Sequence, residues 1–105
     1  MQKFSIVVIG VLLFWDCQSS GINQTKDILV YGSDNCDHCV DFKAELDSVG
    51  FTYGFKDVEF SEALTNEMIH KVRAAGIMGQ INYPVIDVEG KILVAPELIK
   101  VIELM

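Results

Sequence analysis

The fold is decided by one stretch of sequence, Ile28-Leu-Val-Tyr-Gly-Ser-Asp-Asn-Cys36-Asp-His-Cys39. Its continuous apolar start predicts a strand over residues 27–31 that is buried on both faces. A polar turn follows, in which Asp34 or Asn35 can cap a helix. Apolar residues then recur at spacings of three and four up to Val49, which indicates that the helix begins at the Cys-x-x-Cys motif.

This arrangement is suited to thiol chemistry. A helix N-terminus carries unpaired backbone N–H groups and a partial positive charge, and both favour a thiolate over a neutral thiol. The thiolate is the form that attacks disulfides. Cys36 and Cys39 are separated by about one helical turn, so they are close enough to form a disulfide with each other.

Composition limits the classes of protein that fit the chain. Its 105 residues allow one small domain, and its formal net charge is −7. An acidic chain without a cluster of lysine and arginine is not expected to bind nucleic acid or an anionic membrane surface. Three cysteines cannot form a complete disulfide framework, so we expect one redox pair, Cys36 and Cys39, and a separate Cys17.

The first 21 residues are predicted to be an export signal or a lipoprotein-type leader. A single lysine precedes an apolar run over residues 4–15, and Ser19-x-Gly21 is a suitable cleavage site. Cys17 resembles a lipidation site, although Asp16 stands where a small residue is expected. The alternative is that residues 4–15 form a strand or helix of the domain core.

The predicted domain organisation has three parts. They are the leader at residues 1–21, a polar linker at 22–26 and one domain at 27–105. We therefore expect an exported protein, periplasmic or attached to a membrane only through its N-terminus. The alternative is a cytoplasmic protein.

Glycines and capping residues divide the middle of the chain. Gly50 is expected to end the first helix, and a second strand is predicted over 52–58. Ser61 can cap a second helix that ends at Gly76. The buried positions predicted for this helix are Phe60, Leu64, Met68, Val72 and Ala75.

The last part of the chain predicts a hairpin and a helix. A strand over 85–88 begins after Pro84, and the Glu89-Gly90 turn leads into a strand over 91–94. Pro96 is expected to be the first residue of the final helix. The residues expected to pack this helix are Leu98, Ile99, Val101, Ile102 and Met105.

The element order is therefore β-α-β-α-β-β-α. A right-handed crossover makes the first two strands parallel, and the hairpin adds an antiparallel edge. The predicted fold is α/β, with a four-stranded mixed sheet and helices on both faces.

This order resembles the glutaredoxin branch of the thioredoxin superfamily over residues 27–105. Three segments carry the resemblance: the stretch from Ile28 to Cys39, Phe55-Lys-Asp-Val58, and Tyr83-Pro-Val-Ile-Asp-Val-Glu-Gly-Lys91. A Cys-x-x-Cys motif alone is a weak signal. It becomes strong in combination with a proline about 45 residues downstream, at the head of a hairpin.

The resemblance implies a role for each of four residues. Cys36 would be the exposed attacking cysteine, and Cys39 would be the more buried cysteine that resolves the mixed disulfide. Pro84 would be a cis-proline beside the active site. Tyr83 would offer its backbone N–H and C=O groups to a bound substrate in strand-like pairing.

The chain departs from the glutaredoxin pattern at three places. Ser33 stands where a lysine is usual, and residues 94–98 replace the Gly-Gly-x-Asp segment that helps to hold glutathione, leaving Glu97 as the acidic group. The residues between the cysteines are Asp37 and His38 instead of Pro-Tyr. Glutathione use is therefore an open question, and no tightly bound cofactor is expected.

Asp37 and His38 are expected to tune the reactive thiolate in opposite directions. A donor or positive charge on His38 stabilises the Cys36 thiolate, and a stabilised reduced form makes the disulfide more oxidising. The carboxylate of Asp37 disfavours a second anion nearby.

The leading hypothesis is a monomeric thiol–disulfide oxidoreductase that acts through Cys36 and Cys39 on protein or low-molecular-weight thiols and disulfides, with a redox recycling partner. The alternatives are a cytoplasmic, glutathione-dependent glutaredoxin and a non-catalytic module that binds a metal or cluster. A zinc site would need His38 and His70 as further ligands, and adjacent His38 and Cys39 have poor geometry for one ion. Asp57, Glu59 and Asp87 are given no role.

Overall fold

The computed structural model describes residues 23–105. Its elements, in chain order, are β1 (Ile28–Gly32), α2 (Asp37–Ser48), β2 (Gly54–Asp57), α3 (Glu62–Ala74), β3 (Val85–Val88), β4 (Lys91–Val94) and α4 (Leu98–Ile102). The predicted leader, including Cys17, lies outside the described residues. No helix within the described part combines the length and the apolar character that crossing a membrane requires.

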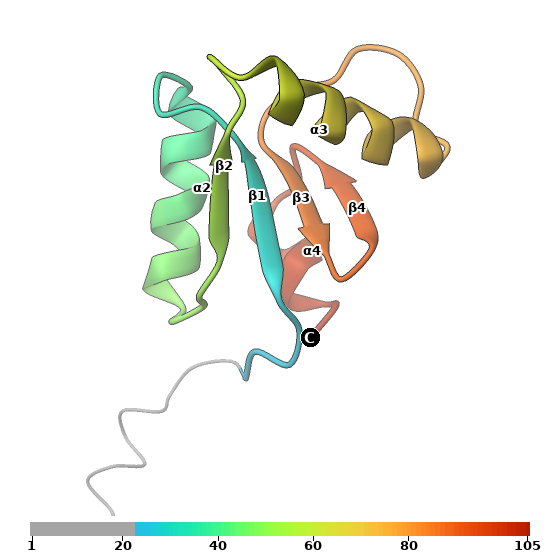
Figure 1. Ribbon diagram of the computed structural model, residues 1–105. Helices are drawn as coiled ribbons and strands as arrows, with labels where there is room; N and C mark the ends of the chain where they lie inside the picture. Colours follow the sequence, from blue (N-terminus) through green and yellow to red (C-terminus); the bar gives the residue numbers. More distant parts are fainter. Residues whose placement is uncertain (1–22) are drawn as a thin grey trace, which may run out of the picture.

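The four strands form one mixed sheet in the order β2-β1-β3-β4 (Figure 1). Strand β1 pairs in parallel with β2 and antiparallel with β3, and β3 and β4 form the antiparallel hairpin. The predicted α/β fold is therefore confirmed. This topology places the carboxyl ends of β1 and β2 and the amino end of β3 at the same end of the sheet.

Both faces of the sheet are covered. Helices α2 and α4 pack on one face, where Phe42, Leu46 and Val101 join Val30 and Ile86 in one buried cluster. Helix α3 covers the opposite face, as Figure 1 shows, and contributes Met68 and Val72 to a second buried cluster. Central strands that are covered on both faces need continuous apolar sequence, which explains why β1 lacks polar alternation.

Three of the predicted buried positions are exposed. Phe60 lies in the loop before α3 and is 87% exposed, and Ala75 follows the last turn of the helix. Ile99 is 50% exposed on α4. Phe60 and Ala75 lie just outside the turns of α3 that touch the sheet. Ile99 lies off the face of α4 that Leu98, Val101 and Ile102 turn toward the core.

The final helix is shorter than predicted. It begins at Leu98, with Glu97 as its N-cap, so Pro96 precedes the helix instead of opening it. Ala95 has a positive φ of 47°, a conformation that L-residues adopt only when their surroundings require it. The chain turns sharply at Ala95 after leaving β4, and the helix begins after this turn.

Gln24 and Lys26, which precede β1, form hydrogen bonds to the domain. The amide of Gln24 donates to the carbonyl of Thr52 at 2.9 Å and accepts from the Thr52 N–H at 2.8 Å. The Lys26 ammonium donates to the carbonyl of Leu104 at 2.7 Å. The segment predicted to be a linker is thus bound to the domain at two places: through Gln24 to the α2–β2 connection, and through Thr25 and Lys26 to the C-terminal turn.

We expect truncation of a buried apolar residue on α3 and of an exposed apolar residue just before it to have very different effects on stability. Met68 is 2% exposed, and Met68→Ala should lower the free energy of unfolding by about 2–5 kcal/mol. Phe60→Ala should change it by less than about 0.5 kcal/mol. Urea denaturation measures both values, and a large loss for Phe60→Ala would contradict the observed position of this side chain.

Candidate active site

Cys36 occupies the N-cap position of α2. Its backbone is extended, with φ −104° and ψ 116°, and its Sγ accepts a hydrogen bond from the backbone N–H of Cys39 at 3.3 Å. Asp34 and Asn35, the residues predicted to cap this helix, lie two positions and one position too early, respectively. The cap is therefore the sulfur atom itself, and a negative charge on it would be stabilised by the N–H and the helix dipole.

Cys39 has the opposite environment. Its side chain is completely buried, whereas that of Cys36 is partly exposed, and both are free thiols. The pKa of the Cys39 thiol is raised to about 12, chiefly because burial penalises the thiolate and further because of its hydrogen bond to Cys36. Cys39 is thus protonated at neutral pH, and its burial keeps the sulfur away from the surface.

Gly32, the last residue of β1, leaves the space that Cys39 fills. A Cβ atom on Gly32 would lie 2.5 Å from Cys39 Sγ and 3.3 Å from Cys39 Cβ. No side chain larger than hydrogen fits there without moving the first turn of α2 or the end of β1. The glycine therefore sets how deeply Cys39 is buried.

A hydrogen-bond network holds the turn that precedes Cys36. The buried hydroxyl of Ser33 donates to the Glu59 carboxylate and accepts from the backbone N–H of Asn35 at 3.0 Å. The side chain of Asn35 also donates to Glu59, at 2.8 Å. The expectation that Glu59 has no role is wrong: its carboxylate joins the β2–α3 loop to the turn before Cys36.

Lys43 is a second residue that the sequence analysis missed. It lies one turn beyond Cys39 on α2, pairs with Asp34 at 2.7 Å and places its ammonium 3.6 Å from the centre of the Phe55 ring. Its positive charge opposes the rise in the pKa of Cys39. The four-residue spacing from Cys39 was the available signal, because residues at i and i+4 share one helix face.

Tyr83 and Pro84 lie across from the N-terminus of α2. Their peptide bond is cis, Pro84 is buried, and its carbonyl accepts from the N–H of Ala95 at 2.7 Å. Within residues 23–105, no hydrogen bond uses the backbone N–H or C=O of Tyr83. These two groups are therefore available for pairing with a bound chain.

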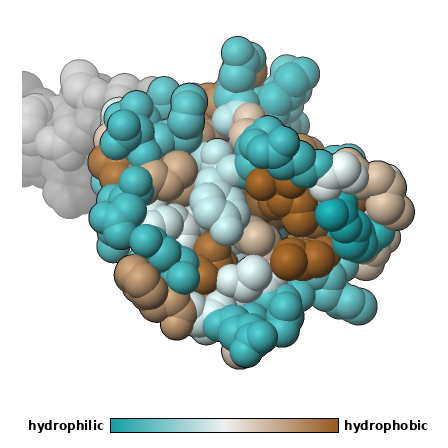
Figure 2. Space-filling view, turned by 90° about the horizontal axis from the view of Figure 1, so that it is seen from above, coloured by the Kyte–Doolittle hydropathy of each residue, from teal (hydrophilic) through white to brown (hydrophobic). Residues whose placement is uncertain are grey.

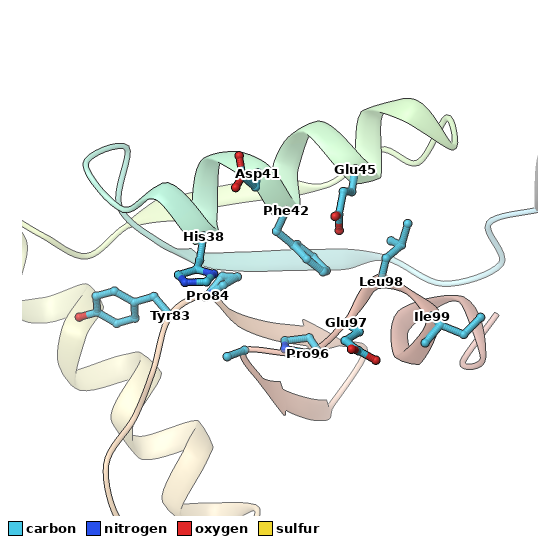
Figure 3. A pocket seen from close by; sticks show the side chains of 11 residues that line it. His38, Asp41, Phe42, Glu45, Tyr83, Pro84, Pro96, Glu97, Leu98 and Ile99 are labelled. Carbon is cyan, nitrogen blue, oxygen red and sulfur yellow. The ribbon is translucent and has the colours of Figure 1, made fainter.

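Several hollows surround Tyr83, and two of them share lining residues. On the end of the molecule seen in Figure 2, hydrophobic and hydrophilic surface patches alternate. A cavity of about 480 Å³ is lined by Cys36, His38, Tyr83 and Ala95. A larger groove of about 660 Å³ shares the last three and continues between α2 and residues 95–99, as Figure 3 shows. The Cys36 sulfur thus lines a cavity that continues into a groove large enough to hold a ligand of peptide size.

The two residues between the cysteines occupy different positions. His38 is exposed and lines both hollows, close to Tyr83 and Pro84 in Figure 3. Asp37 is exposed in the first turn of α2 and lines neither hollow. His38 is therefore placed to meet a substrate directly, whereas Asp37 can act only through its charge.

The residues considered for a zinc site are not brought together. His70 lies on α3 and lines a separate cavity with Lys71 and Asp87, on the other face of the sheet from α2. Across residues 23–105, no three His, Cys, Asp or Glu side chains form a group that could hold a metal ion.

The fold and the cysteine pair define a class of protein. A mixed four-stranded sheet with helices on both faces and a Cys-x-x-Cys pair at a helix N-terminus is the arrangement of thioredoxin-fold redox proteins. The family model for glutaredoxin matches residues 28–93, and the chain belongs to the glutaredoxin family. Members of this family generally act on thiols and disulfides. No curated protein gives a significant match to the chain.

We expect the contact between Gly32 and Cys39 to be detectable as an energetic coupling. Gly32→Ala should lower the free energy of unfolding of the reduced protein by about 1–3 kcal/mol, because the new methyl group overlaps Cys39 Sγ. In a Cys39→Ala background the same substitution should cost much less, since the sulfur is gone. Equal costs in both backgrounds, measured by urea denaturation, would contradict this account.

The Glu59 network gives a separate expectation. Glu59→Ala removes the acceptor of the buried Ser33 hydroxyl and should cost about 1–2 kcal/mol of unfolding free energy. It should also speed alkylation of Cys36 by loosening the preceding turn. Glu59→Gln is the matched control, since it keeps an acceptor oxygen and should retain most of the stability. If the two variants behave alike, the network does not order the turn.

Proposed function

We propose that this protein is a thiol–disulfide oxidoreductase that acts by dithiol–disulfide exchange through Cys36 and Cys39. The observation that carries the proposal is the asymmetry of the pair. Cys36 Sγ is partly exposed and accepts an N–H hydrogen bond at a helix N-terminus, whereas Cys39 is buried with a raised pKa. This is the arrangement that distinguishes an attacking thiolate from a resolving thiol.

The reaction begins when the Cys36 thiolate attacks one sulfur of a substrate disulfide. A bond forms between Cys36 and that sulfur, the substrate disulfide breaks, and the other sulfur leaves as a thiolate that takes up a proton. Cys39 then loses its proton and attacks Cys36 Sγ. The second substrate thiol leaves with a proton, so the substrate gains two electrons and two protons and the protein gains a disulfide.

The second step requires a thiolate at Cys39. One cause of its raised pKa is the interaction with Cys36, and the charge of Cys36 disappears once that sulfur is in a mixed disulfide. The charge of Lys43 also lowers the pKa of Cys39. Both effects favour ionisation of the resolving thiol at the stage where it is needed. A dithiol, or two molecules of a monothiol, then reduces the new disulfide and closes the cycle.

Tyr83 and Pro84 are proposed to hold the substrate. The unused backbone groups of Tyr83 lie on the wall of the cavity that contains Cys36, so an extended substrate segment can pair with them beside the reacting sulfur. His38 faces the same cavity, where a donor or positive charge stabilises the thiolate. The direction of electron flow depends on the reduction potential, with about −200 mV or lower indicating a reductant and about −120 mV an oxidant.

An export leader at residues 1–21 is also part of the proposal. It is supported by the apolar run over residues 4–15 that follows Lys3. Cell fractionation that finds a shortened form outside the cytoplasm would support it, and full-length protein confined to the cytoplasm would contradict it.

The two cysteine variants are expected to stop the reaction at different stages. Cys36→Ser should abolish turnover of a peptide disulfide, because Cys39 is buried and protonated. Cys39→Ser should still carry out the first step and accumulate a mixed disulfide with one substrate fragment, visible by mass spectrometry. Full activity of Cys36→Ser would contradict the proposal, and activity in Cys39→Ser without the intermediate would contradict the role of Cys39.

A further inference from the structure

The groove beside Cys36 has a property that thiol exchange alone does not require. It continues from the cavity of the reactive sulfur, with which it shares His38, Tyr83 and Ala95. A polypeptide joined to Cys36 can therefore extend along it, between α2 and residues 95–99. Side chains near the substrate cysteine would meet the walls of this groove.

The walls combine apolar and acidic groups. The apolar side chains that line the groove include those of Phe42, Leu98 and Ile99. Its carboxylates are those of Asp41, Glu45 and Glu97. In Figure 3, Phe42 and Glu45 extend from α2 toward the segment that carries Leu98. No lysine or arginine is among the lining residues.

The negative charge of the groove is not balanced by the rest of the domain. Within residues 23–105, no ion pair involves Asp41, Glu45 or Glu97. Asp41 and Glu45 lie four positions apart on α2, a spacing at which like charges destabilise a helix. Carboxylates that repel one another across a groove are stabilised by a cationic ligand.

The same groups disfavour an anionic ligand. Glutathione has two carboxylates and one ammonium group, and it would bring net negative charge to a groove without a lysine or arginine to receive it. The apolar floor suits a larger partner, since Ile99 is half exposed there. Further exposed apolar residues, Phe60 and Met78, lie in loops at the same end of the sheet, where a protein surface could cover them.

We propose that this groove selects polypeptide substrates that have lysine or arginine close to the reacting cysteine. The inference rests on the proposed disulfide exchange at Cys36 and names the substrate class of that site. The basic side chains bind the carboxylates and do not react. The bonds that form and break are those of the exchange itself, and the electrons pass between the substrate disulfide and the cysteine pair.

Two peptide disulfides of equal length provide the test, one with lysine and one with glutamate flanking the cysteine. A neutral small disulfide serves as a third substrate. The full chain should reduce the lysine peptide roughly tenfold faster, as kcat/KM at low salt, than the glutamate peptide. Added salt should shrink this ratio because it screens charges beyond about 8–10 Å.

A matched pair of triple variants separates the groove from the overall charge. D41N/E45Q/E97Q removes the three groove carboxylates, and D47N/E62Q/E103Q removes three exposed carboxylates elsewhere, so the net charge rises equally. The ratio of lysine to glutamate peptide should fall toward one only in the first variant. Thermal unfolding of both variants checks that they are folded.

The outcomes distinguish this inference from the proposed function. If the neutral disulfide is reduced but the ratio is near one, or falls equally in both triple variants, the groove does not select by charge. Faster reduction of a glutathione mixed disulfide than of the lysine peptide would also overturn the inference. If none of the disulfides is reduced, the proposed function itself is wrong, and this inference falls with it.

Discussion

The contact between Gly32 and Cys39 is the constraint on which the site depends. A Cβ atom at position 32 would lie 2.5 Å from Cys39 Sγ, so the strand and the helix approach as closely as a hydrogen atom allows. This close contact sets how near the first turn of α2 lies to the end of β1. It buries one sulfur and leaves the other at the helix N-terminus, three residues earlier.

The chemical difference between the two thiols follows from that geometry. Both have the same intrinsic chemistry, yet burial raises the pKa of Cys39 to about 12, while Cys36 Sγ accepts the N–H of Cys39. Lys43 limits the effect of burial because its charge lies on the same helix face, one turn away. Position in the fold, more than residue type, therefore distinguishes the two thiols, and in the proposed exchange it sets the order of the two steps.

Other parts of the chain support this site because the sheet topology brings them to one end. The parallel pairing of β1 and β2 carries Glu59 to the turn before Cys36, where it accepts from Ser33 and Asn35. The antiparallel pairing of β1 and β3 carries Tyr83 to the other side of the sulfur. The segment that leads into the short α4 then completes the acidic groove through Glu97, the N-cap of that helix.

The sequence by itself determined the element order, the sheet and the cysteine pair at the start of α2. These depend on short-range patterns: the apolar run of β1, the helical spacing after Cys39, and the proline before β3. It did not predict the N-cap at Cys36, the exposure of Phe60 or the start of α4, because each depends on which turns touch the sheet. The roles of Glu59, Asp41 and Glu45 were also decided by the tertiary structure alone, whereas Glu97 had already been recognised in the sequence as an acidic group near the site. Hydrogen bonds and charges between residues far apart in the chain leave no local pattern, since only folding brings their side chains together.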